Sequence, residues 1–110
     1  MSYNRRLTLA EMETHLEAAA KWGAAAKMAS LLSHDAGVLA QIQFEEAILA
    51  ARKTELRAKR GASAEDVRQM KDEATVIISR TLQQLQKSNI QRFEANQPRA
   101  TFWKNRLRAP

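Results

Sequence analysis

Glycine and proline, the residues that most often interrupt helices, are scarce in this chain and widely spaced. Its 110 residues include three glycines and two prolines. Gly37 and the Gly61–Ser63 step divide an alanine- and leucine-rich body into segments of helical length, and Pro98 is expected to end the last of them. This spacing predicts an all-α fold, either a three-helix up-down-up bundle or a helical hairpin with a long third helix. The expected helices are residues 9–33, 36–60 and 64–96.

The first segment begins with a helix N-capping pattern, and the residues of its helical stripe then change from large to small. Residues 8–11 form a capping box, in which the threonine hydroxyl and the glutamate carboxylate each accept a hydrogen bond from a backbone N–H. A single stripe then follows at helical spacing: Leu9, Met12, Leu16, Ala19, Gly23, Ala26 and Ser30. Its small half, Ala19, Gly23 and Ala26, predicts close packing against another helix, unless these residues only raise helix propensity. Trp22, beside the stripe, is expected at the edge of the core.

The second and third segments carry most of the predicted core. Residues 33–37 combine weak helix formers with N-cap residues, which indicates a tight turn or a kink in one long helix. The apolar face of residues 36–60 is wide enough to contact two neighbouring helices. Ser63, followed by two acidic residues, begins the third helix. The side chains expected to be mostly buried include Leu16, Ile42, Leu49, Ile77 and Leu82.

The positive charge of the chain is concentrated at its two ends. The formal net charge is +6, yet residues 9–97 hold twelve acidic and twelve Lys or Arg side chains. Arg5 and Arg6 make the N-terminal end basic, and four cations do the same in residues 98–110. The chain therefore divides into one helical domain, residues 1–97, and a basic, aromatic C-terminal arm, residues 98–110.

This C-terminal arm is the strongest candidate for a partner-binding site. It is too short to bury its own aromatic side chains, and aromatic residues and arginine are enriched in protein interfaces. We expect Phe102 and Trp103 to lie in a groove of a neighbouring chain, with the arginines near acids or phosphates. The predicted partner-binding residues are Arg99, Phe102, Trp103, Arg106, Leu107 and Arg108.

The sequence contains no pattern typical of a catalytic or metal site. His15 and His34, the only histidines, fall in different segments and lack the spacing of a zinc or di-iron site. Neighbouring acids such as Glu45 and Glu46 point about 100° apart on a helix and do not form a proton-sharing pair. The three glycines are isolated, so they do not form a phosphate-binding loop. We therefore expect a protein that is not an enzyme and that uses no cofactor or metal.

These features favour an assembly function. The leading hypothesis is a small helical assembly or adaptor subunit of a larger complex or particle, which docks to protein chains, copies of itself included, through its arms and helical faces. The alternative is a basic helical protein that binds nucleic acid, because the cations of residues 52–60 and of the arm could contact phosphates. Residues 1–12 lack the apolar segment of a signal peptide, and no stretch is long and apolar enough to span a membrane. We expect a cytoplasmic or particle-bound protein without a signal peptide.

Overall fold

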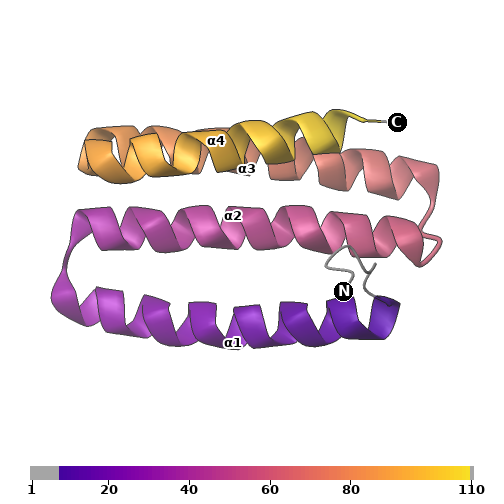
Figure 1. Ribbon diagram of the computed structural model, residues 1–110, viewed down its shortest axis with the longest axis horizontal. Coiled ribbons are helices and arrows are strands. Elements are labelled where there is room, and N and C mark those ends of the chain that lie inside the picture. The colour runs from indigo at the N-terminus through magenta and orange to yellow at the C-terminus, as the bar shows by residue number, and fades with distance from the viewer. Residues whose placement is uncertain (1–7, 110) are drawn as a thin grey trace, which may run out of the picture.

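Four helices make up the part of the chain that the structure describes (Figure 1). The structure is a computed structural model that describes residues 8–109, without the side chains of residues 29–33. Arg5 and Arg6, the basic N-terminal end, therefore lie outside the described residues. No strand occurs in residues 8–109, so the all-α prediction is confirmed, whereas the predicted number of helices is wrong. The helices are α1 (Leu9–Ser33), α2 (Ala36–Lys59), α3 (Ala64–Ser88) and α4 (Ile90–Arg108).

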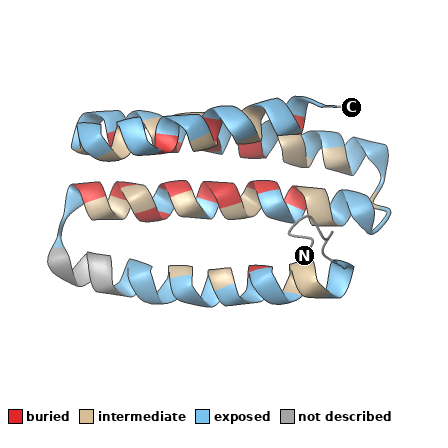
Figure 2. Ribbon diagram, viewed as in Figure 1, coloured by how far each residue is buried: buried red, intermediate tan, exposed pale blue. Residues whose placement is uncertain are grey.

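α2 is the central helix of the fold. It contacts each of the other three helices, with α1 on one side and α3 and α4 together on the other (Figure 1). Buried residues are concentrated on the facing surfaces of α2, α3 and α4, whereas α1 is exposed along most of its length (Figure 2). The wide apolar face of α2 matches this central position. The core cluster consists of Ala40, Phe44, Ala47, Ile48, Ala51, Ala74, Ile78, Leu85, Ala100 and Leu107.

The predicted helix starts are confirmed by their hydrogen bonds. Thr8 Oγ1 accepts from the Glu11 N–H at 3.1 Å, and a Glu11 carboxylate oxygen accepts from the Thr8 N–H at 3.4 Å. Ser63 Oγ accepts a backbone N–H of the first turn of α3 at 3.2 Å. Between α1 and α2, the Asp35 side chain caps α2 and His34 has a φ of 57°. The chain therefore turns at this point and does not continue as one kinked helix.

The predicted third helix, residues 64–96, is wrong in its C-terminal boundary. α3 ends at Ser88, and the extended backbone of Asn89 (φ −161°, ψ 102°) joins it to α4. The Asn89 side chain accepts a hydrogen bond from the Arg92 N–H at 3.1 Å and so caps α4. Gly37, at the start of α2, lies against this junction, because a Cβ at Gly37 would be 3.2 Å from the Asn89 Cβ. The glycine thus lets the α3–α4 junction pack closely on α2.

Pro98 lies inside α4 and does not end a helix. Residues 98–108 are therefore the second half of α4, and two of their side chains, Ala100 and Leu107, belong to the core. Proline removes one backbone donor and usually kinks or breaks a helix. Here Pro98 is exposed, and burial of the apolar side chains that follow it favours continuation of the helix.

One side chain of α3 that was predicted to be buried is exposed. Ile77 is 38% exposed, whereas the adjacent Ile78 is fully buried. The buried side chains of α3 are Ala74, Ile78, Thr81 and Leu85. Among the other side chains predicted to be buried, Leu16 and Ile42 are buried, and Leu49 and Leu82 are half-buried.

Candidate functional site

The partner-binding residues predicted in the C-terminal segment fall into two groups. Leu107 is buried in the core, and Arg99 and Arg106 form ion pairs with glutamates of α2. These three side chains are engaged within the chain. Phe102, Trp103 and Arg108 form no ion pair with α2 and lie wholly or partly at the surface of α4.

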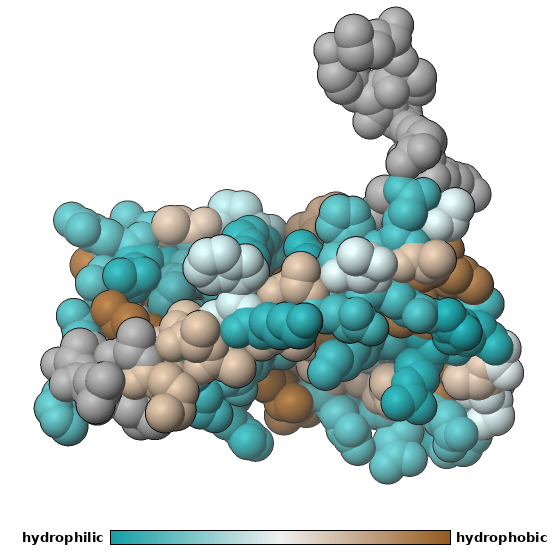
Figure 3. All heavy atoms as spheres, turned by 90° about the horizontal axis from the view of Figure 1, so that it is seen from below, coloured by the Kyte–Doolittle hydropathy of each residue, from teal (hydrophilic) through white to brown (hydrophobic). Residues whose placement is uncertain are grey.

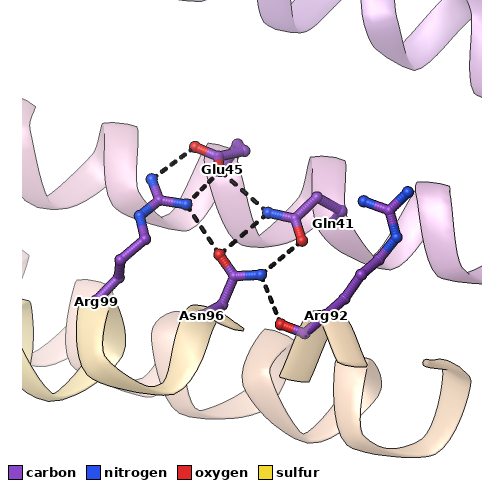
Figure 4. A network of polar contacts seen from close by, with 5 residues as sticks. All are labelled: Gln41, Glu45, Arg92, Asn96 and Arg99. Carbon is purple, nitrogen blue, oxygen red and sulfur yellow. Dashed lines mark hydrogen bonds and ion pairs between the residues drawn. The ribbon is translucent and has the colours of Figure 1, made fainter. Parts of the chain in front are cut away.

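A polar network joins α2 and α4 along one edge (Figure 4). The Asn96 amide nitrogen donates to Gln41 Oε1 at 2.6 Å and to the Arg92 carbonyl oxygen at 2.7 Å. The Asn96 amide oxygen accepts from Gln41 Nε2 at 3.3 Å and from the Arg99 guanidinium at 2.9 Å. Arg99 also donates two hydrogen bonds to the Glu45 carboxylate, at 2.5 and 2.9 Å. Asn96 is only 5% exposed, so its side chain depends on these partners.

A second ion pair fixes the C-terminal half of α4 to α2. Arg106 Nε and Nη2 donate to the two carboxylate oxygens of Glu55 at 2.6 and 2.8 Å. The same guanidinium lies 5.7 Å from the centre of the Trp103 ring and 5.8 Å from that of Phe102. The two rings meet edge to face, with their centroids 5.5 Å apart. The aromatic pair is thus oriented by an arginine that is itself paired.

The ion pairs stabilise the charged forms of Glu45, Arg99 and Arg106. The hydrogen bonds from Arg99 hold the pKa of the Glu45 carboxyl below its usual value, although partial burial acts in the opposite direction. Hydrogen bonding to Glu45 raises the pKa of Arg99, and hydrogen bonding to Glu55 raises the pKa of Arg106. The two ion pairs therefore link α2 and α4 electrostatically.

Much of this network was missed in the sequence, although a signal for it is present. Arg92, Asn96, Arg99, Trp103 and Arg106 recur at steps of three and four, which places them on one face of a helix. The expectation that a helix ends before proline hid this stripe, because it assigned the residues to two separate segments.

α1 and α2 leave a hollow along part of their seam. The small residues predicted to pack closely, Ala19, Gly23 and Ala26, line a groove of about 320 Å³ opposite Ile42 and Leu49 of α2. A Cβ added at Gly23 would have no heavy atom within 4 Å. The predicted close packing is therefore not formed at Gly23 within the described chain.

α1 also exposes large apolar side chains. Trp22, predicted at the edge of the core, borders the same groove but is 78% exposed, and Met28 is 66% exposed. On the side of the molecule that α1 covers, hydrophobic residues are interspersed with hydrophilic ones (Figure 3). Among residues 9–28, only Leu16 is buried. The α1 helix thus presents an outer surface with a prominent aromatic side chain.

A second groove, of about 350 Å³, lies where α1, α2 and α4 meet. Apolar side chains of all three helices and a set of titratable side chains share its lining. The apolar group is Met12, Leu16, Leu56 and Trp103, and the titratable group is His15, Arg52, Glu55 and Arg106.

The structure brings the basic segment of residues 52–60 and the C-terminal part of α4 to one end of the molecule (Figure 1). The ion pair between Glu55 and Arg106 joins them, and a hollow of about 760 Å³ is lined by both Ala58 and Arg108. The exposed cations at this end include Arg52, Lys53, Arg57, Lys59 and Arg108.

Neither a metal-ligand cluster nor a membrane span is found in the described part of the chain. No group of three or more His, Asp or Glu side chains there could hold a metal ion. None of the described helices is both long and apolar enough to cross a membrane. Comparison of the chain with protein-family models, with curated proteins and with solved structures found no match. The function must therefore be inferred from the exposed aromatic side chains, the grooves and the cationic end.

Proposed function

We propose that this chain is a non-enzymatic helical assembly or adaptor subunit that docks to other protein chains through its helical faces. The observation that carries the proposal is the exposure of two large aromatic side chains on opposite layers of the bundle. Trp22 on α1 is 78% exposed and Phe102 on α4 is 54% exposed. Buried aromatic side chains commonly supply much of the binding energy of protein interfaces.

Both aromatic side chains lie beside a concave surface, which supports docking more than exposure alone does. Trp22 borders the groove of about 320 Å³ between α1 and α2. Phe102 lines a shallow hollow on α4 together with Pro98 and Thr101. A projecting ring beside a hollow can insert into a partner while the hollow receives a side chain in return.

The docking residues of α4 are fewer in this proposal than in the prediction from sequence. Leu107, Arg99 and Arg106 are engaged within the chain, so the partner surface rests on Phe102, the outer part of Trp103 and Arg108. Arg106 then contributes indirectly, because it stacks on both rings and fixes their orientation.

Site-specific photo-crosslinking tests this function. A benzophenone amino acid is introduced separately in place of Trp22, Phe102 and, as a control, Gln83, an exposed polar side chain of α3. We expect the first two positions to form a discrete crosslinked protein species, either with a second copy or with another chain, and the control to form none. Equal or absent crosslinking at all three positions would contradict the proposal.

Nucleic-acid binding is a second candidate, favoured by the joining of two basic segments at one end of the molecule. Arg57 and Lys59 from α2 and Arg108 from α4 lie at this end, and all three are exposed. Phosphate contacts of this kind lose affinity steeply as salt concentration rises. Fluorescence anisotropy of a labelled DNA duplex at several salt concentrations tests it, with Arg57→Gln compared with Arg80→Gln, an exposed cation of α3. An affinity that is independent of salt, or equal losses in both variants, would rule out a phosphate site at this end.

A further inference from the structure

The groove between α1, α2 and α4 combines an apolar floor with cations at its mouth. Its volume of about 350 Å³ lies in the range of small-molecule sites. Leu16 is buried, and Leu56 and Trp103 are half-buried, so three helices contribute apolar surface to the floor. Such a floor favours a ligand with an apolar, flat or chain-like body.

The two arginines that line this groove differ in their hydrogen bonding to acidic side chains. Arg106 already donates two hydrogen bonds to Glu55, so the charges of these two side chains compensate each other. The two bonds use Nε and Nη2 of Arg106 and do not involve Nη1. Arg52 forms no hydrogen bond or close ion pair within residues 8–109; it interacts at longer range with Glu45, which lies outside this lining, and is exposed at the groove. His15 supplies a third nitrogen group to the same lining. The lining itself thus holds two guanidinium groups and one carboxylate, an excess of one positive charge over the acidic groups of the groove.

We propose that this groove binds a small amphiphilic anion, with its apolar body on the Leu16–Leu56–Trp103 floor and one carboxylate or sulfonate at Arg52. The charge of the ligand matches the excess positive charge of the lining, and its body matches the apolar floor. This site needs no partner chain, so it is independent of the assembly function.

Two dyes that differ chiefly in charge test the site on the full chain. Anilinonaphthalene sulfonate has an aromatic body with one sulfonate, and phenylnaphthylamine has nearly the same body without it. We expect saturable binding of the sulfonate dye at one site per chain, measured by fluorescence titration and calorimetry. Arg52→Gln should weaken the sulfonate dye by about threefold to tenfold, as expected for one partly exposed charged contact. The same substitution should leave the affinity for the uncharged dye within about twofold.

Matched variants locate the binding. Lys53→Gln removes an adjacent exposed cation that does not line the groove, and it should leave the affinity for both dyes unchanged. Met12→Glu places a carboxylate in the groove and should abolish binding of the sulfonate dye, whereas Ala10→Glu on the exposed side of the same turn should not. Circular dichroism of each variant confirms that the helices are retained.

Three outcomes would overturn the site. These are the absence of saturable binding of the sulfonate dye, equal losses in Arg52→Gln and Lys53→Gln, and an equal loss of both dyes in Arg52→Gln. The second outcome would mean a diffuse effect of net charge, and the third would mean that Arg52 acts only through the shape of the groove.

Discussion

At the scale of single residues, the edge between α2 and α4 is held by polar side chains that share a network of hydrogen bonds. Asn96 is the most buried of them, and four hydrogen bonds satisfy its amide. A buried polar group that loses its partner costs more than the net stabilisation that one hydrogen bond supplies. The packing of α4 against α2 along this edge therefore depends on every member of the network, and a substitution that removes one member should lower the stability of the fold.

Asn96→Ala should lower the free energy of unfolding by about 1–3 kcal/mol, because Gln41 and Arg99 lose a partner at a largely buried place. Urea unfolding followed by circular dichroism measures the change. Asn105→Ala, at an exposed position of the same helix, is the control and should have little effect. If both substitutions cost the same, the network does not stabilise the fold.

Glu45 should make the stability depend on pH in the acidic range. Hydrogen bonding to Arg99 holds the pKa of Glu45 below its ordinary value of 4.5 in the folded chain. The stabilisation is therefore fully present above pH 4.5 and is lost as pH falls through the lower pKa of the folded state. Urea unfolding between neutral and acidic pH should show this loss in the parent chain and a smaller loss in Glu45→Gln. A variant with an unchanged acid profile would show that another carboxylate is responsible.

At the scale of elements, the helix ends are set by side chains that cap them, and the proline does not set one. Asn89 is the single residue between α3 and α4, and its side chain caps α4, whereas Pro98 lies in the middle of α4. Because Pro98 lacks a backbone N–H, α4 retains a local defect that its packing tolerates. The burial of Ala100 and Leu107 outweighs that defect.

Pro98→Ala should raise the free energy of unfolding by about 1–3 kcal/mol, because it restores a backbone donor at an exposed helical position. Thermal and urea unfolding measure the gain. The neighbouring Gln97→Ala, also exposed, should change stability only slightly. A loss of stability in Pro98→Ala would mean that the packing of α4 requires the bend that proline imposes.

Deletion of residues 98–110 should reduce helix content and cooperativity of unfolding. The truncation removes Ala100 and Leu107 from the core and both Arg99 and Arg106 from their glutamates. This expectation reverses the one that follows from treating the segment as an arm. Circular dichroism of the truncated chain measures both quantities. If residues 1–97 kept the helix content that they have in the full chain and unfolded as cooperatively as it does, the core role of α4 would be contradicted.

At the scale of the whole molecule, the fold is a three-helix core with a fourth helix attached to one side. Every side chain of the core cluster comes from α2, α3 or α4. α1 contributes the buried Leu16 and forms two ion pairs, Lys27 with Glu46 of α2 and Glu13 with Arg60, the C-cap of α2. Exposed ion pairs of this kind stabilise little, so α1 should open more readily than the rest.

Amide hydrogen exchange should therefore proceed through local opening in α1 and through global unfolding in α2 and α3. In Leu16→Ala the exchange of α1 should accelerate by about tenfold or more, with α3 unchanged, because the buried contact of α1 is lost. Ile78→Ala, in the core cluster, should accelerate all helices together. Uniform acceleration in both variants would show that α1 is part of one cooperative unit.

The sequence by itself determined the fold class and the positions where the first three helices begin. Capping signals such as Thr8 with Glu11, and Ser63, act within one turn, so they can be identified from the residues alone. The same holds for the apolar faces of α2, because periodicity is a local property of the chain.

Only the tertiary structure decided where the third helix breaks, what the C-terminal segment does and what the small stripe of α1 faces. Continuation of α4 through Pro98 depends on the burial of Leu107 against other helices, and no local rule contains that free energy. The pairing of Arg99 with Glu45 likewise joins residues 54 positions apart. Whether Gly23 meets a helix or a groove depends on how far Leu16 and its neighbours hold α1 from α2, a distance set by packing and not by composition.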